Sequence, residues 1–420
     1  MSKTLTAGLL FLVFLAIYYI GSFSRIPFAD CMAFVLMTER NEIETIATPT
    51  SHALYINTAI LLKNITQLNA IEANRLLVIF SAAISVVLIY LTVRNLTKMN
   101  WAALVTAIVF GFSFTFWKNA EIVEVYTYNA LWLTSFYFCI INSFISAKKN
   151  IYIILSGLFL GISIWLHIQN FLLIPAYLLF LFYFKTYQSA LGYSLGIFCC
   201  IFSLMFIVNY SQGLPLYSPF SDNQGHWVQD SFEKSFSQYA LDLIKSVGYL
   251  IYNFNVFVFV GIIGMIMLYK ENKQMFYIFF TAAMLMYGFA TFYAVSDNYI
   301  FFLPFNIIFA LAIGYGLTSK RYLFFRKLSW ICILIPTFYY TCFSIVSFTE
   351  QGKNFNDFKS YKGGLKYYML PWMNDNKGIL EFVIDKKIAP EPINWMTNSA
   401  EIYIEILKQK GYSEEEIKKL

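Results

Sequence analysis

The sequence has few charged residues for its length. Charged side chains make up 13% of its 420 residues, whereas hydrophobic side chains make up 59%, and the mean hydropathy is +0.59. A water-soluble globular domain typically carries about 25% charged residues. This shortage therefore excludes an ordinary soluble domain and predicts an all-α polytopic membrane protein.

Several motifs that carry chemistry are also missing. The chain has no P-loop and no glycine-rich nucleotide cradle, which argues against direct use of ATP or a nucleotide sugar. It has no His-x-x-x-His, Cys-x-x-Cys or Asp-x-Asp pattern, so we expect no metal ligands and no cofactor, and metal dependence stays open. Five of the six cysteines lie in apolar runs, so no disulfide framework is expected. The net charge of +6 comes from basic residues scattered through short loops, which excludes nucleic acid as a partner.

Long hydrophobic runs, by contrast, are abundant. A transmembrane helix needs about 20 mostly apolar residues. Apolar runs fall at roughly 5–22, 76–94, 101–116, 126–146, 151–168, 170–184, 189–209, 247–268, 276–294, 299–318 and 328–348. We therefore predict about eleven transmembrane helices.

The basic residues predict the orientation of these helices. With the N-terminus in the cytoplasm, every inner loop is basic, as the positive-inside rule requires. The inner loops then hold Arg94, Lys98, Lys148, Lys149, Lys185, Lys270, Lys273, Lys320, Arg321, Arg326 and Lys327. We expect a multi-pass protein, typical of a bacterial inner membrane, with a cytoplasmic N-terminus and an extracytoplasmic C-terminus.

This orientation places the longer polar stretches outside. They divide the chain into a transmembrane domain, 1–348, with a first outer loop at about 23–75, and a tail, 349–420. Ser51 to Ile65 is too short to span and fits an interfacial helix. In the tail, Asn398–Glu401 and Ser413–Glu416 fit capping boxes and Gly411 fits a helix end, so we predict short tail helices.

Asp30 is the first candidate catalytic residue. It follows the first span within Arg25-Ile26-Pro27-Phe28-Ala29-Asp30. A carboxylate there avoids the roughly 2.5–3.5 kcal/mol cost of the bilayer centre and could deprotonate a hydroxyl group within hydrogen-bond range. A solvated loop acid beside Arg25 is an equally common alternative.

Further polar groups are expected at the same membrane edge. Glu121 and Glu124 are three residues apart, so on a helix they would share one face, either in a site or in a salt-bridged edge with Lys118. His167 is followed by two amides at a helix break, which supplies hydrogen-bond donors for an anionic headgroup, although a lone histidine is more often structural. Asp297 lies in a short turn that is either part of this site or a simple turn before Pro304.

Together these residues resemble a known family. The matching positions are Asp30, Leu54-Tyr55, Phe116-Trp117, Ala120, Glu124-Val125-Tyr126-Thr127, Gly157, Gly161, His167, Asp297, Tyr299 and Pro304. Their order is similar to that of the protein O-mannosyltransferase-like membrane proteins of the GT-C glycosyltransferase superfamily. The resemblance covers roughly residues 5–320, and the Glu-Val-Tyr-Thr block is its most specific part.

The resemblance implies a GT-C-like bundle and a glycosyltransferase that moves a sugar from a polyprenyl-phosphate donor to a hydroxyl acceptor, such as a protein Ser or Thr, on the outer face. Asp30 would be the base, and Glu124 would orient the acceptor or the sugar. The remaining roles are phosphate binding by Arg25, Lys118 and His167, and substrate binding by His52, Tyr126, Asp297 and Tyr299. The chain departs from the family pattern at Cys31-Met32-Ala33, where a small residue, Gly and Glu are usual, and at Thr48–Ala53.

Three alternatives stay open. A lipid-linked saccharide polymerase or ligase would be expected to carry a late outer loop rich in Arg and His, whereas 210–246 has one His and no Arg. A transporter or flippase usually needs charged groups near the bilayer midplane, and these spans have almost none. A catalytically inactive scaffold is the third, because the first-loop motif is altered.

Overall fold

The computed structural model describes residues 2–22, 26–28, 30–221, 226–295, 298–319, 329–372, 375–390 and 393–420. Within these ranges the secondary structure is helical, with no strand. The all-α prediction is therefore confirmed. Arg25, Asp297 and the basic residues of 320–328 lie outside the described residues.

Seven helices in the described ranges are long and apolar enough to cross a membrane. They are α1 (Lys3–Gly21), α4 (Ala70–Thr97), α8 (Lys149–Leu166), α10 (Gln188–Ser211), α14 (Lys273–Phe292), η3 with α15 (Asn298–Phe302 and Leu303–Gly316) and η5 with α17 (Ser329–Leu334 and Ile335–Phe348). Two bent pairs raise the count to nine: α5 (Asn100–Gly111) with α6 (Phe114–Ala120), and α12 (Phe236–Phe254) with α13 (Phe257–Glu271). The other two runs form α7 (Tyr126–Ile145) and a shorter helix, η1 (Ile168–Leu173) with α9 (Ile174–Tyr183). The number eleven is thus not confirmed.

The run 247–268 is not one straight helix. It begins inside α12 and bends by 99° before α13. The bend falls at Asn255, whose φ of 44° is rare for a residue with a side chain. Upstream of the bend, α12 is amphipathic: Phe236 and Ile244 are exposed, whereas Ser246 and Asn253 are buried. A helix of this kind suits the membrane interface better than the bilayer centre.

The spans run up and down, so the bundle has two distinct ends. At one end, Lys3 Nζ donates to Asn95 Oδ1, which joins the start of α1 to the end of α4. The same end, here called the basic face, holds Lys98 and Lys148 at the helix termini. The opposite end, the loop face, carries the first loop (described residues 26–69), the turn 121–125 and the tail.

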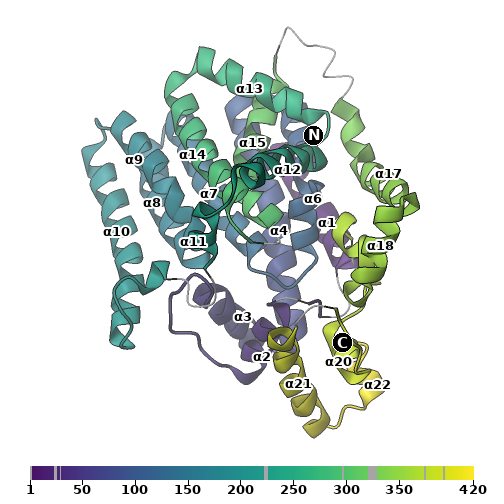
Figure 1. Ribbon diagram of the computed structural model, residues 1–420. Helices are drawn as coiled ribbons and strands as arrows, with labels where there is room; N and C mark the ends of the chain where they lie inside the picture. Colours follow the sequence, from purple (N-terminus) through teal and green to yellow (C-terminus); the bar gives the residue numbers. More distant parts are fainter. Residues whose placement is uncertain are drawn as a thin grey trace.

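The first loop and the tail form one packed unit on the loop face. The loop contributes α2 (Cys31–Arg40) and α3 (Ala53–Thr66), and the tail contributes α18 (Glu350–Phe358), η6 (Ser360–Lys362), α19 (Gly364–Met369), α20 (Ile379–Ile384), α21 (Asn394–Gln409) and α22 (Glu414–Ile417). Figure 1 shows α20, α21 and α22 gathered beside α2 and α3. Phe28 lies 5.4 Å from Phe382 between ring centroids, and Ile379 N–H donates to Ile26 O at 2.8 Å. The hydrophobic core of this unit is therefore shared by two segments far apart in sequence.

The helix signals in the tail had mixed success. Short helices are confirmed, Ser413 and Glu416 form a capping box, and Gly411 follows α21 with a φ of 90°. The predicted capping box at Asn398 is wrong, because α21 begins four residues earlier, at Asn394. The apolar face of α21, which includes Tyr403 and Leu407, packs in the shared core.

Candidate functional site

Asp30 stands at the start of α2, on the loop face. It is the N-cap residue, but within the described structure its side chain makes no capping hydrogen bond. The side chain is exposed, yet the surrounding protein desolvates the carboxyl group and raises its pKa, while the nearby His52 partly lowers it again. Asp30 is therefore accessible and a stronger base than an ordinary aspartate.

His52 faces Asp30 from the start of α3. Its backbone is left-handed, with φ at 47°, a conformation in which histidine is enriched. The ring nitrogen Nδ1 lies 3.1 Å from Leu166 O. Because a carbonyl oxygen only accepts, Nδ1 carries the proton and Nε2 is left as an acceptor in the neutral ring. Burial lowers the pKa of His52, and the Asp30 carboxylate opposes that shift.

Glu124 is the second carboxylate of the site. It lies in the turn between α6 and α7 and is 6% exposed. Its Oε1 atom is 3.6 Å from Cys31 Sγ, in the residue directly after Asp30. The structure thus brings both predicted catalytic carboxylates to the start of α2, although they are separated by more than ninety positions in the sequence.

Glu121 has a different environment. It ends α6, so the expectation that Glu121 and Glu124 share one helix face is wrong. Trp117 Nε1 donates to Glu121 Oε1 at 2.6 Å, and a Cβ on Gly21 would lie 1.9 Å from the same oxygen. Glu121 therefore joins α6 to the end of α1, where only glycine leaves room for it.

His167 and Tyr126 form an aromatic wall beside His52. His167 lies between α8 and η1, with its ring centroid 6.1 Å from that of His52 and 5.8 Å from that of Tyr126. Burial lowers the pKa of His167 to about 3, so the ring is neutral and contributes no positive charge. The two amides that follow do not face a ligand. Gln169 donates to Phe301 O and Asn170 to Ser163 O, which holds the helix break together.

Lys118 lies beside the Tyr299 ring of η3. The Lys118 ammonium is 5.7 Å from the centroid of the Tyr299 ring and 4.1 Å from that of Tyr367. Lys118 is 1% exposed and donates to Tyr367 O, so α19 covers it. In this arrangement Lys118 does not present its charge to an open surface.

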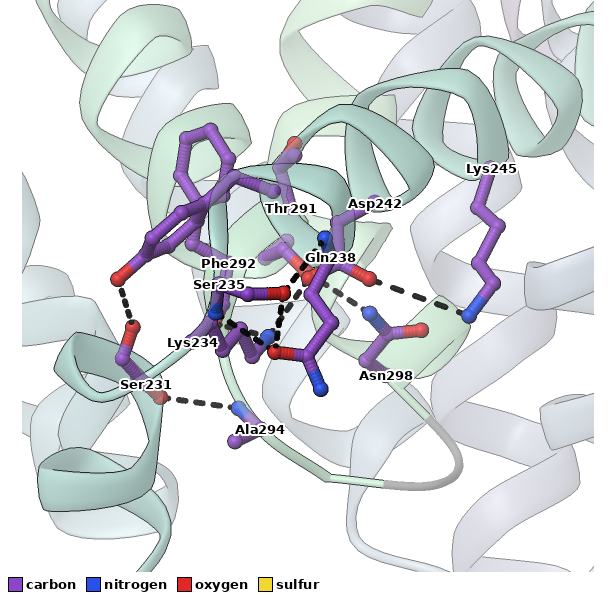
Figure 2. Close-up of polar contacts among 12 residues, drawn as sticks. Ser231, Lys234, Ser235, Gln238, Asp242, Lys245, Thr291, Phe292, Ala294 and Asn298 are labelled. Atoms are coloured by element: carbon purple, nitrogen blue, oxygen red, sulfur yellow. Dashed lines mark hydrogen bonds and ion pairs between the residues drawn. The ribbon is translucent and has the colours of Figure 1, made fainter.

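Lys245, on α12, is an accessible cation that the sequence did not predict as a site residue. Lys234 Nζ contacts Asp242 Oδ2 at 2.7 Å and Phe292 O at 2.8 Å, which ties α12 to the end of α14 (Figure 2). Lys245 is about half exposed and lies 3.9 Å from the same aspartate. One turn further along, the Tyr249 ring centroid is 6.2 Å from that of Tyr299. The spacing of Asp242 and Lys245 along an amphipathic helix is the signal that could have found it.

The predicted site residues therefore form two adjoining groups. Asp30, His52, Glu124, Tyr126 and His167 lie together around the start of α2. Lys118 and Tyr299 lie together under α19, and η3 is the shared wall, because its Phe301 ring also contacts His167. Arg25 and Asp297 lie outside the described residues. Among the residues that are described, no group of three or more His, Cys, Asp or Glu side chains is arranged to hold a metal ion.

Comparison with known proteins finds a match to a glycosyltransferase family over part of the chain. Residues 45–191 match the family described as Protein O-mannosyl-transferase TMEM260 N-terminal domain. The matched segment includes His52, Glu124, Tyr126 and His167, whereas Asp30 precedes it. No curated protein matches the sequence significantly.

Solved structures share the fold at low sequence identity. ArnT from Cupriavidus metallidurans in the apo state superposes with a TM-score of 0.62 and 12% identity, over 86% of this chain and 69% of ArnT. ArnT bound to undecaprenyl phosphate superposes with a TM-score of 0.57 and 11% identity, over 90% of this chain and 71% of ArnT. The oligosaccharyltransferase of Archaeoglobus fulgidus, in complex with zinc and sulfate, superposes with a TM-score of 0.51 and 12% identity. The match covers 87% of this chain but only 58% of that enzyme. The bundle is thus a GT-C fold.

The electrostatic interaction between Asp30 and His52 predicts a measurable titration. Since the Asp30 carboxylate stabilises the imidazolium form, Asp30→Asn removes that stabilisation and lowers the pKa of His52 further below its ordinary value. The chain has only three histidines, so NMR of histidine-labelled protein in detergent resolves them, and His226→Gln and His167→Gln assign the signals. Glu42→Gln, a surface acid of the same loop, is the control. A His52 pKa that stays constant or rises in Asp30→Asn contradicts this electrostatic interaction.

Proposed function

We propose that this chain, which matches an O-mannosyltransferase family over residues 45–191 and shares its fold with ArnT, is a glycosyltransferase that moves a sugar from a polyprenyl-phosphate donor to a hydroxyl acceptor, such as a protein Ser or Thr. One observation carries the proposal: Asp30 is accessible, has a raised pKa, and stands beside Glu124 at the end of the membrane bundle. The ArnT relative, whose structure holds undecaprenyl phosphate, supports the class of donor.

The chemistry follows from these positions. Asp30 takes the proton of the acceptor hydroxyl, and the oxygen attacks the anomeric carbon of the sugar. The bond between that carbon and the phosphate oxygen breaks, and polyprenyl phosphate leaves with the electron pair. A raised pKa makes the Asp30 carboxylate a better base than an ordinary aspartate. Glu124 lies close enough to orient the acceptor or a sugar hydroxyl, and such alignment can contribute several kcal/mol, up to about 7–11, of barrier lowering.

The leaving phosphate needs a cation. His167 is neutral and Lys118 is covered by α19, so neither supplies an accessible charge as the protein stands. Lys245 supplies an accessible positive charge. It lies one turn before Tyr249 on α12, and the Tyr249 ring lies near that of Tyr299. We therefore assign donor phosphate binding to Lys245, and Lys118 joins it only where α19 moves aside.

The first test is the base. Asp30→Asn keeps the size of the side chain and removes its basicity, so the transfer rate should fall by at least about 10²-fold, the usual scale for a lost general base. Transfer is measured in detergent with a polyprenyl-phosphate sugar and a Ser/Thr peptide. Asp357→Asn, an exposed tail acid, is the control, and thermal melting checks folding. Full activity of a folded Asp30→Asn protein would exclude Asp30 as the base.

The second test is the cation. Lys245→Ala removes one charge-assisted hydrogen bond to the donor, so KM for the lipid donor should rise on the order of 10-fold with little change in kcat. Lys270→Ala removes an exposed lysine from the basic face and should leave both constants unchanged. If Lys245→Ala changes neither constant, the phosphate is bound elsewhere.

We also propose that the loop face is extracytoplasmic and the basic face cytoplasmic. The lysines and arginines near α1, α4 and α8 gather on the basic face, and juxtamembrane cations favour the cytoplasm. The two carboxylates lie at the other end. A polyprenyl-phosphate sugar presented on the outer leaflet would therefore reach them without crossing the bundle.

Cysteine labelling tests the sidedness. Ile388→Cys places a thiol at a tail position that is 95% exposed, and an impermeant maleimide should label it in intact cells. Lys148→Cys, on the basic face, should react only after permeabilisation, and the unaltered protein gives the background of the native cysteines. The opposite pattern would reverse the orientation.

A further inference from the structure

Cys31 occupies a special position between the two carboxylates of the site. It is the first residue of α2 and is completely buried. It is covalently joined to Asp30, and its Sγ lies 3.6 Å from Glu124 Oε1. The position of Cys31 therefore influences where Glu124 lies relative to Asp30.

The Cys31 thiol has one proton to donate and two hydrogen-bond acceptors within reach. Its Sγ is also 3.6 Å from Phe28 O, one turn earlier. A charged oxygen is the stronger acceptor, so Glu124 attracts the S–H more than the carbonyl does. Burial and the nearby carboxylates of Glu124 and Asp30 all raise the pKa of the Cys31 thiol, so it stays protonated and remains a donor.

Resting on the proposed function, we propose that Cys31 is a positioning residue, whose S–H donated to Glu124 sets the spacing of the two carboxylates and aligns the acceptor hydroxyl between them. Sulfur suits this role because the Cβ–S bond is longer than a Cβ–O bond. A serine hydroxyl would fall short of Glu124 unless that side chain moved toward it. Cys31 thus explains how this chain works with Cys-Met-Ala after Asp30.

The kinetic test compares three variants. Cys31→Ala removes the donor, so kcat/KM for the acceptor should fall about 10-fold, the scale of one hydrogen bond to a charged group, while KM for the lipid donor stays constant. Cys31→Ser should be intermediate. Cys139→Ala, another buried cysteine on α7, leaves a similar cavity and should change neither constant.

An infrared measurement tests the contact without relying on activity. The S–H stretching band of Cys31 is identified as the band lost in Cys31→Ala. In Glu124→Gln it should move to higher wavenumber, because an amide oxygen accepts less strongly than a carboxylate, whereas Glu42→Gln should leave it in place.

The two measurements separate the possible failures. A band unaffected by Glu124→Gln overturns the contact, and a band that moves without any kinetic change in Cys31→Ala overturns the positioning role. If the unaltered protein transfers no sugar from any polyprenyl-phosphate donor, the proposed function fails and Cys31 has no acceptor to position, while the infrared band still decides the contact.

Discussion

The site depends on helix breaks inside an apolar bundle. A break frees backbone N–H and C=O groups, and where water is excluded these groups must find partners within the protein. At the break between α5 and α6, Tyr18 and Tyr339 donate to the carbonyls of Gly111 and Phe112, each at 2.8 Å. On the other side of the same break, Thr115 N–H donates to Asn253 Oδ1 at 2.9 Å. Buried polar side chains from α1, α12 and α17 thus stabilise the bend that leads to Glu124.

The same constraint separates structural from chemical polar groups. Asn170 and the Nδ1 of His52 donate to carbonyls at the end of α8, and Gln169 donates to the carbonyl of Phe301 on η3. Glu121 is used by an indole N–H. Asp30, by contrast, is exposed at the start of α2, and its side chain makes no capping hydrogen bond in the described structure. A polar residue in this bundle is therefore a candidate for chemistry only after the backbone groups near it have been accounted for.

Sequence reasoning predicted the spans better than the site. The runs 5–22, 151–168 and 189–209 correspond to α1, α8 and α10 within a few residues, because polar residues bound each apolar run. The bend of 99° at Asn255 was not predicted, because a hydropathy profile carries no information on the direction of a helix. Asp30 and Glu124 were chosen because both follow span ends, but their link through Cys31 is a contact across more than ninety residues that no local pattern encodes. Lys245 was not predicted as a site residue because the segment 210–246, which contains the first part of the amphipathic helix α12, was interpreted as an outer loop.

The tail, separate in sequence, is part of the same site. Tyr367 O accepts from Lys118, Met369 O accepts from Tyr252 at 2.7 Å, and the Trp372 ring lies 5.4 Å from Trp117. These contacts join residues 367–372 to α6 and α12, the two helices that follow or precede the bends. Since α20 and α21 also pack on the first loop beside Asp30, the tail touches both groups of site residues. A boundary at residue 348 therefore divides the chain but not the site, and any movement of α19 would uncover Lys118.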